Sequence, residues 1–169
     1  MWEQDLCDFT DVTLGLGRLQ QVLRELSPVL GHYADYPVNG PRVLLMPGPG
    51  EKHTFGLIMV AEFFRRAGWD VAGGPLEPNG DPAIIVRREW FDVVGFSVAS
   101  DMNLPELGDC IATVREASMN PHLGIVVGGP VFTSHPEYVS LVQADAAAGD
   151  GSQAPKLAEK LMANPAGRG

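Results

Sequence analysis

The chain has 169 residues, about the size of one domain, and its 45% hydrophobic and 20% charged residues are ordinary for a globular protein. Its formal net charge of −9 argues against direct binding to nucleic acid, which usually requires a basic face. We find no leader sequence, no apolar run of the ~20 residues that span a bilayer, and no metal or CxxC spacing between Cys7 and Cys110. These features predict a cytoplasmic protein with reduced thiols and no membrane partner.

Residues 1–40 are predicted to form a separate helical segment and linker. Apolar side chains recur there at helical spacing, at Leu16, Leu19, Val22, Leu23 and Leu26. Residues 32–41, "HYADYPVNGP", are rich in turn formers and predict a linker. Two explanations of the apolar stripe stand side by side. It either packs on the rest of the chain or over a cofactor, or it is a surface for a partner or for self-association.

From residue 41 onward, apolar strands alternate with helices. The predicted strands cover residues 42–48, 69–73, 91–100, 123–132 and 144–150. The predicted helices cover residues 54–67, 81–90, 105–118, 134–143 and 152–164. This alternation is typical of a parallel sheet covered on both faces. We therefore expect residues 41–169 to form one Rossmann-like α/β domain, a flavodoxin-type doubly wound sheet of five parallel strands in the order 2-1-3-4-5.

The loop after the first predicted strand, "GPGEKHTFG", carries a histidine. In this strand order ligands bind beyond the carboxyl ends of the strands, at the switch point where this loop lies. A loop histidine is most often simply solvated. Here, however, Glu51 lies two residues before His53, and Ser97 ends the apolar part of the neighbouring strand. Because an imidazole that binds a metal usually donates its other N–H to a carboxylate or carbonyl, these three residues are candidates for a metal ligand and its relay.

The last two strands end in small residues. Gly128 and Gly129 end the fourth strand, and "AGDGS" follows the fifth, with Gly149 and Asp150. Paired glycines make a tight turn or let a flat or bulky group approach the backbone. A deep, narrow slot beside the sheet requires such a pattern, whereas the phosphate-binding motifs GxGxxG and GK[ST] are missing. We expect a bulky side chain at either Gly128 or Gly129 to close this slot while the fold survives.

Together these segments resemble the cobalamin-binding domain family, whose motif is DxHxxG, then SxL or a variant, then GG. The matching residues are Glu51-Lys52-His53-Thr54-Phe55-Gly56, Ser97-Val98-Ala99 and Gly128-Gly129. The resemblance covers about residues 41–164. Glu51 stands where the family has aspartate, and Ala99 stands where it usually has leucine.

The resemblance implies a cobalamin bound base-off, with His53 as the lower ligand of cobalt. Glu51 and Ser97 are then the relay behind the histidine, and Gly128 and Gly129 line the slot for the nucleotide tail. The other residues expected to contact the cofactor are Lys52, Thr54, Phe55, Gly56, Ala99, Pro130, Gly149 and Asp150. The upper ligand, adenosyl, methyl or hydroxo, is left open. Haem is the alternative cofactor, because a histidine serves both.

Residues 2–28 and 53–71 resemble the photosynthesis antirepressors of purple bacteria, PpaA and AerR, and a haem-binding relative. This resemblance implies a photosensory or regulatory module that signals to a DNA-binding repressor protein and is not an enzyme. The alternatives are the small subunit of a cobalamin-dependent mutase, which starts almost directly at its first strand, and a methyl-carrying corrinoid protein, which needs a helical bundle. The sequence shows no nucleophile–base pair. The expected moving parts are residues 1–40 and 73–81.

Overall fold

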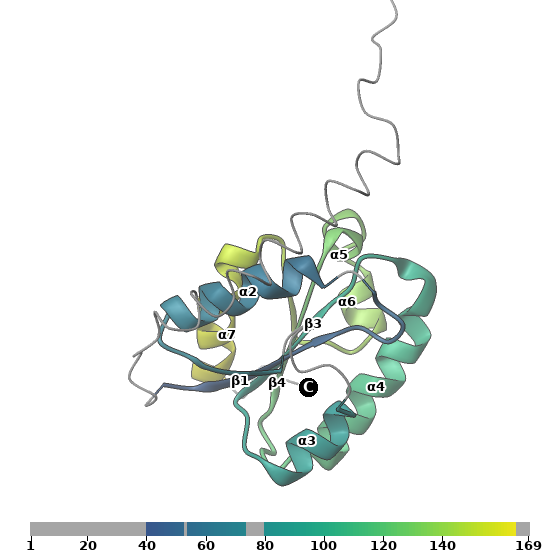
Figure 1. The fold of residues 1–169 in the computed structure, drawn as a ribbon. Helices are drawn as coiled ribbons and strands as arrows, with labels where there is room; N and C mark the ends of the chain where they lie inside the picture. The colour runs from purple at the N-terminus through teal and green to yellow at the C-terminus, as the bar shows by residue number, and fades with distance from the viewer. Residues whose placement is uncertain (1–39, 53, 74–79, 165–169) are drawn as a thin grey trace, which may run out of the picture. The chain divides into compact units, whose positions relative to one another are not determined.

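The computed structural model describes residues 40–52, 54–73 and 80–164 of the chain (Figure 1). The predicted apolar stripe of the N-terminal segment lies outside the described residues, and so does most of the 73–81 loop. The boundary between an N-terminal segment and residues 41–169 therefore stays a prediction.

A five-stranded sheet forms the centre of the described fold. Its strands are β1 (Arg42–Pro47), β2 (Asp70–Gly73), β3 (Val93–Ser97), β4 (Gly124–Gly128) and β5 (Ala146–Ala148). They lie in the order β2-β1-β3-β4-β5, and every neighbouring pair is parallel. This confirms the predicted doubly wound order. It places the switch point at the carboxyl ends of β1 and β3.

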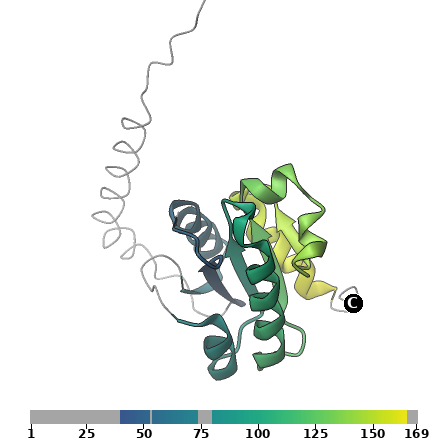
Figure 2. The same ribbon diagram turned by 90° about the vertical axis from the view of Figure 1, so that its right-hand side faces the viewer.

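Helices cover both faces of this sheet (Figures 1 and 2). One face carries α2 (Phe55–Arg66) and α7 (Ala154–Ala163), and the other carries α3 (Pro82–Arg88) and α4 (Leu104–Ala117). The shorter elements are the helices α5 (Pro130–Ser134) and α6 (Tyr138–Leu141) and the 3-10 turns η1 (Asp101–Asn103) and η2 (Gly151–Gln153). In the described part of the chain, no helix is long and apolar enough to cross a membrane.

Alternate residues of each strand pack into two separate hydrophobic cores, one on each face of the sheet. Towards α3 and α4, the buried strand residues include Leu44, Val94 and Ile125. Towards α2 and α7, they include Leu45 and Val126. Strands that are apolar on both faces read as continuous hydrophobic runs, and for this reason the sequence predicted them well. Each fully buried side chain of this size stabilises the fold by about 1.5–3 kcal/mol.

The helix boundaries follow local sequence chemistry as expected. The Asp81 carboxylate accepts a hydrogen bond from the N–H of Ala83 at 2.9 Å, which caps α3, and Pro82 occupies the first turn. Gly68 follows the end of α2 with a φ of +85°, a conformation that favours glycine at this position.

The fourth strand and the helix after it differ from the prediction. The strand predicted over residues 123–132 ends at Gly128, because Gly129 turns the chain with a φ of +123° and Pro130 opens α5. The single helix predicted over residues 134–143 is wrong. Pro136 has no N–H and disfavours a helical conformation of His135, so α5 ends there and the chain continues as the separate helix α6.

The third strand is also shorter than predicted. It ends at Ser97, and the Ser100 side chain accepts a hydrogen bond from the N–H of Met102 at 3.2 Å, which caps η1. The predicted strand over residues 91–100 therefore contains the start of a capped turn. This turn directs the chain from the carboxyl end of β3 towards α4.

An arginine network holds the opposite, amino edge of the sheet. The Nε of Arg42 donates to Asp70 at 2.6 Å, its Nη2 donates to Glu89 at 3.1 Å, and its guanidinium lies 4.8 Å from the centre of the Phe91 ring. Burial alone would lower the pKa of Arg42, but the hydrogen bonds to Glu89 and Asp70 outweigh it and raise that pKa. The network ties β1 to its neighbours on the side away from the switch point.

Candidate cofactor-binding site

A cavity of about 620 Å³ lies between α2 and the sheet, at the carboxyl ends of the strands. Its volume falls within the roughly 300–1,000 Å³ typical of small-molecule sites. We call this cavity the slot. The predicted site residues that line it are Gly56, Ser97, Gly128, Gly129, Pro130, Gly149 and Asp150. The slot thus gathers residues from four separate loops or strand ends at the place where the sequence predicted one.

The slot exists because the strand ends carry small side chains in register. Ser97 of β3 pairs with Gly128 of β4, which pairs with Ala148 of β5. Side chains two positions apart share a face, so Gly95 lies on the same face as Ser97, one pleat deeper. Since none of these four residues carries a large side chain, α2 leaves a hollow above the sheet where a larger residue would fill it.

The two glycines at the end of β4 play different parts. A Cβ on Gly128 would lie 3.6 Å from the carbonyl oxygen of Ala148, an ordinary contact, so a side chain fits there. A Cβ on Gly129 would lie 1.9 Å from the carbonyl oxygen of Val98, and the φ of +123° is itself strained for any other residue. The expectation that a bulky residue at Gly129 leaves the fold intact is therefore wrong. For Gly128, where a Cβ makes only an ordinary contact, the same expectation stays a prediction.

The rim of the slot is shaped by three further glycines. A Cβ on Gly56 would lie 3.9 Å from Ser97 Oγ, so the serine hydroxyl faces the start of α2. A Cβ on Gly149 would meet no atom within 4 Å, which marks open space. At Gly151 a Cβ would lie 2.9 Å from Val60 Cγ2. Glycine there lets the chain after β5 approach α2 closely and close one side of the slot.

Asp150 places a carboxylate at the mouth of the slot. One of its oxygens accepts the N–H of Ser152 at 3.0 Å and the other accepts the Ser152 hydroxyl at 2.9 Å. These hydrogen bonds hold the pKa of Asp150 below its ordinary value, so the group is ionised at neutral pH. The remaining lone pairs of the carboxylate can accept hydrogen bonds from hydroxyl or amide donors of a ligand.

The loop that follows β1 is tied to the segment that follows β3. The Glu51 carboxylate accepts a hydrogen bond from the N–H of Ala99 at 2.7 Å and another from the N–H of Lys52, the next residue, at 2.9 Å. Asn103 Nδ2 donates to the carbonyl of Pro49 at 2.9 Å. A second cavity of about 240 Å³ lies between the same two segments. These bonds hold residues 49–52 in place beside the switch point.

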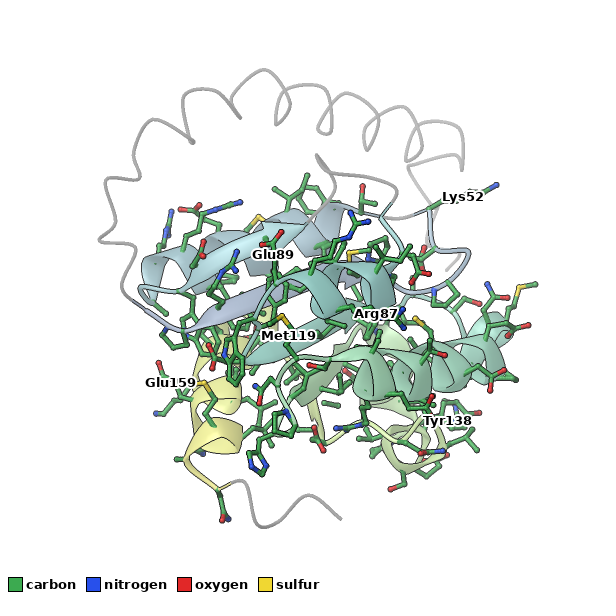
Figure 3. All side chains as sticks on the ribbon, turned by 90° about the horizontal axis from the view of Figure 1, so that it is seen from below. Lys52, Arg87, Glu89, Met119, Tyr138 and Glu159 are labelled. Atoms are coloured by element: carbon green, nitrogen blue, oxygen red, sulfur yellow. The ribbon has the colours of Figure 1, made fainter. Side chains whose placement is uncertain are left out.

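Five other predicted site residues are not among those that line the slot: Glu51, Lys52, Thr54, Phe55 and Ala99. His53 itself is outside the described residues, so its predicted role as a ligand stays a prediction. Figure 3 shows the Lys52 side chain extending away from the ribbon. Thr54 and Phe55 occupy the N-cap and first position of α2, and Ala99 is exposed.

The predicted relay from Glu51 to Ser97 also stays a prediction. The described hydrogen bonds of the Glu51 carboxylate go to backbone N–H groups, whereas the Ser97 hydroxyl faces Gly56 across the slot. Two backbone donors already orient the carboxylate, which is the positioning that a relay to an imidazole requires.

Sequence reasoning missed several lining residues. Gly95, in the interior of β3, was readable, because glycine within a strand often marks a close approach by another group. Thr133 and Ser134 also line the slot, but they lie in the segment whose turn at Gly129 was not predicted. Asn103 gave no distinguishing signal, since its contact with Pro49 joins residues 54 positions apart.

The fold is similar to several solved structures. It superposes on a novel cobalamin-binding protein from Desulfitobacterium hafniense with a TM-score of 0.60, at 18% identity over 85% of this chain and 66% of that one. It superposes on the monomethylamine corrinoid protein of Methanosarcina barkeri with a TM-score of 0.71, at 15% identity over 95% of this chain and 74% of that one. The chain thus spans about two-thirds to three-quarters of each. At such identities the likeness shows the fold alone.

A broader neighbour and a sequence relative complete the comparison. The CheY-like protein TadZ of Pseudomonas aeruginosa matches with a TM-score of 0.53, at 15% identity over 72% of this chain and 99% of that one. An uncharacterized 20.5 kDa protein of Rhodobacter capsulatus, encoded in the bchF-crtJ intergenic region, is 27% identical over 149 residues, 88% of this chain and 77% of the relative. The model of the B12 binding domain matches residues 41–158, more than half of the chain. The chain therefore belongs to the B12 binding domain family.

Proposed function

We propose that this chain is a cobalamin-binding regulatory module that holds the cofactor base-off, with His53 on cobalt, and signals to a partner transcription regulator. The observation that carries the proposal is the slot beside the sheet. Family membership supports a corrinoid cofactor, and the similarity to cobalamin-binding and corrinoid proteins agrees with it.

The residues of the slot fit a long, narrow group such as a nucleotide tail. A Cβ on Gly149 would meet no atom within 4 Å, which leaves space that a ligand can fill, and Gly128 adds no side chain to the lining. Ser97 and Asp150 present a hydroxyl and an ionised carboxylate at the mouth, where sugar hydroxyls and amide side chains need partners. A bound cobalamin supplies a cobalt centre whose upper ligand can exchange or be released by light.

In this proposal, different residues of the chain bind different parts of the cofactor. His53 would take the place of the cofactor's own base as a ligand of the metal. Glu51 holds residues 51–52, just before the histidine, through the N–H of Ala99, which would limit the freedom lost on binding. The slot would hold the released base away from the metal.

The slot also favours cobalamin over haem. Haem carries no nucleotide tail to place in a cavity beside the sheet, whereas the released tail of base-off cobalamin can occupy it. A haem-binding sensor of the same fold is thus the weaker candidate, although a histidine can ligate either metal.

Regulation through a protein partner fits the chemistry of the described chain. A formal net charge of −9 disfavours a phosphate backbone, whose contacts need Lys and Arg. A cofactor regulates only when it binds two states of a protein with different affinity. The similarity to the bchF-crtJ intergenic protein supports a place beside the photosynthesis antirepressors and a repressor as the partner.

The first test is cofactor binding followed by visible absorption. Wild-type protein and His53→Ala are titrated with hydroxocobalamin, adenosylcobalamin and haemin in turn. We expect base-off cobalamin spectra with wild type and strongly weakened binding with His53→Ala, because the cobalt bond is lost. Equal cobalamin binding by both proteins would show that His53 is not the ligand. Binding of haemin alone would assign the site to haem.

The second test addresses signalling. A purple-bacterial repressor is titrated with the apo protein, with cobalamin-loaded protein in the dark, and with the same sample after illumination. We expect the affinity to differ between at least two of these states. Identical affinities in all three would refute the regulatory role. Mutase turnover on addition of a large subunit would instead support an enzyme component.

A further inference from the structure

The floor of the slot is apolar. The lining residues set one pleat below the strand ends are Leu45 of β1, Gly95 of β3 and Val126 of β4. Helix side chains close the space above them, at Leu57, Val60, Phe63, Phe64 and Ala154. Val126 lies two residues before Gly128 on the same face, roughly 7 Å deeper. Whatever reaches this floor therefore meets hydrocarbon from the sheet and from two helices.

The polar side chains of the described lining gather at the mouth. They are Ser97, the last residue of β3; Thr133 and Ser134, in the helix after β4; and Asp150, after the end of β5. Each lies at or beyond the last residue of its strand. The backbone groups of the floor do not compensate, because those of Gly95 and Val126 belong to central strands paired on both sides.

We propose that this floor selects corrinoids by their lower base, taking a methylated benzimidazole and rejecting a purine. The inference rests on the proposed function, since it assumes that the released base enters the slot. Dimethylbenzimidazole presents a hydrocarbon edge with two methyl groups. Adenine presents ring nitrogens and an exocyclic amine at the same place, and none of the described floor side chains can pair with them.

The size of the discrimination follows from the cost of burying unpaired polar groups. Leaving such a group without a partner weakens binding by about tenfold to a hundredfold, and the two lost methyl contacts act in the same direction. A pocket made only of hydrocarbon discriminates poorly between alkyl groups, but it discriminates well against an unpaired hydrogen-bonding group.

The experiment measures equilibrium dissociation constants for three probes: hydroxocobalamin, the corresponding corrinoid with adenine as its lower base, and cobinamide, which has no nucleotide. The fraction of each free corrinoid that is base-off is measured from its spectrum and divided out. For wild type we expect the adenine corrinoid to bind at least about tenfold more weakly than cobalamin. Equal corrected affinities would overturn the inference.

Two variants place a hydroxyl on the floor. Val126→Thr keeps the β-branched shape, and Ala154→Ser adds a hydroxyl from the first turn of α7, so one variant remains if the other folds poorly. We expect each to reduce the preference for cobalamin over the adenine corrinoid severalfold. For each protein we take the ratio of the dissociation constant of the adenine corrinoid to that of cobalamin. When the ratios of a variant and of wild type are compared, the base-off equilibria of the free corrinoids cancel. The matched control is Val94→Thr, on a central strand but facing α3 and α4, which should leave the ratio unchanged.

Binding of the three probes distinguishes failure of the proposed function from failure of the selectivity. If cobalamin and cobinamide bind with equal affinity, or if neither binds, the proposed use of the slot by the tail is refuted. Cobalamin binding more tightly than cobinamide, but no more tightly than the adenine corrinoid, would leave that function standing and refute the selectivity. A ratio that Val94→Thr shifts as much as Val126→Thr does would also refute it, because a general loss of packing would then be the cause.

Discussion

Adjacent glycines at the end of β4 should respond to substitution in opposite ways. For Gly129→Ala, the φ of +123° costs about 1–3 kcal/mol, and the 1.9 Å approach of the new Cβ to the Val98 carbonyl oxygen forces a further backbone shift. We expect a loss of at least about 3 kcal/mol, or a fall in Tm of about 6–12 °C for a protein of this size. For Gly128→Ala, the 3.6 Å contact is ordinary, and we expect a change within about 1 kcal/mol of unfolding free energy.

A larger side chain at Gly128 should reduce cofactor binding without reducing the stability of the fold. Gly128→Leu keeps the backbone and directs a branched side chain into the slot between Ser97 and Ala148, its small neighbours in register. We expect thermal unfolding close to that of Gly128→Ala. We also expect cobalamin affinity to be reduced at least about tenfold, with cobinamide affected less because it has no tail.

The assays are thermal unfolding followed by circular dichroism, and titration with both corrinoids followed by absorption. Equal stability of the two alanine variants would refute the structural reasoning about Gly129. Normal cobalamin binding by a folded Gly128→Leu protein would mean that the slot is not used. Equal losses for cobalamin and cobinamide would point to a damaged site, not a blocked tail.

Three further predictions can be tested with the same protein. Glu51→Gln should weaken cobalamin binding by about 10–100-fold, less than loss of the histidine does, because the carboxylate that holds the Ala99 N–H also positions the loop; an unchanged dissociation constant would contradict this. Arg42→Met should cost about 1 kcal/mol of unfolding free energy, because its ion pairs are partly exposed, and should leave corrinoid binding unaltered. The Asp150 carboxyl should titrate below the ordinary pKa of aspartate in a carbon-13 NMR experiment, because the N–H and the hydroxyl of Ser152 donate to it, so its contribution to stability is complete above that ordinary pKa and is lost as the pH falls through the lowered one; an ordinary or raised pKa would show that the bonds from Ser152 do not form.

The sheet was predictable because its signal is local and repeated. Strands such as Arg42–Pro47 are apolar on both faces, and each is followed by a helix with its own start signal, such as Asp81-Pro82. The two errors between residues 123 and 143 each arise at a single residue inside a run that otherwise reads as regular structure. Gly129 turns the chain through a positive φ that the apolar run around it does not indicate, whereas Pro136 carries a helix-ending signal that the sequence did contain.

The site was predictable in outline and less so in detail. Motif positions placed Gly56, Ser97 and Gly128 around one cavity, because parallel strands end at a common edge. Which glycine tolerates a side chain depends on the carbonyl oxygen of Val98, a contact 31 residues away in sequence, and no local pattern reveals it. The apolar floor was hidden for the same reason, since Val126 and Phe63 look like ordinary core residues until the gap between them is known.

The two departures from the family motif meet at a single hydrogen bond. Glu51 is one methylene longer than aspartate, and its carboxylate reaches the N–H of Ala99 at 2.7 Å on the far segment. The donor is a backbone group, so the bond does not depend on the side chain at position 99, and alanine preserves it. Glu51 therefore accepts one hydrogen bond within its own loop, from the N–H of Lys52, and one from the segment that follows β3. In this chain the segment before His53 is held from the end of β3 and the residues just after it, because Gly48 donates its N–H to the carbonyl of Ser97 and Ala99 donates its N–H to Glu51. Ser97 also lines the slot.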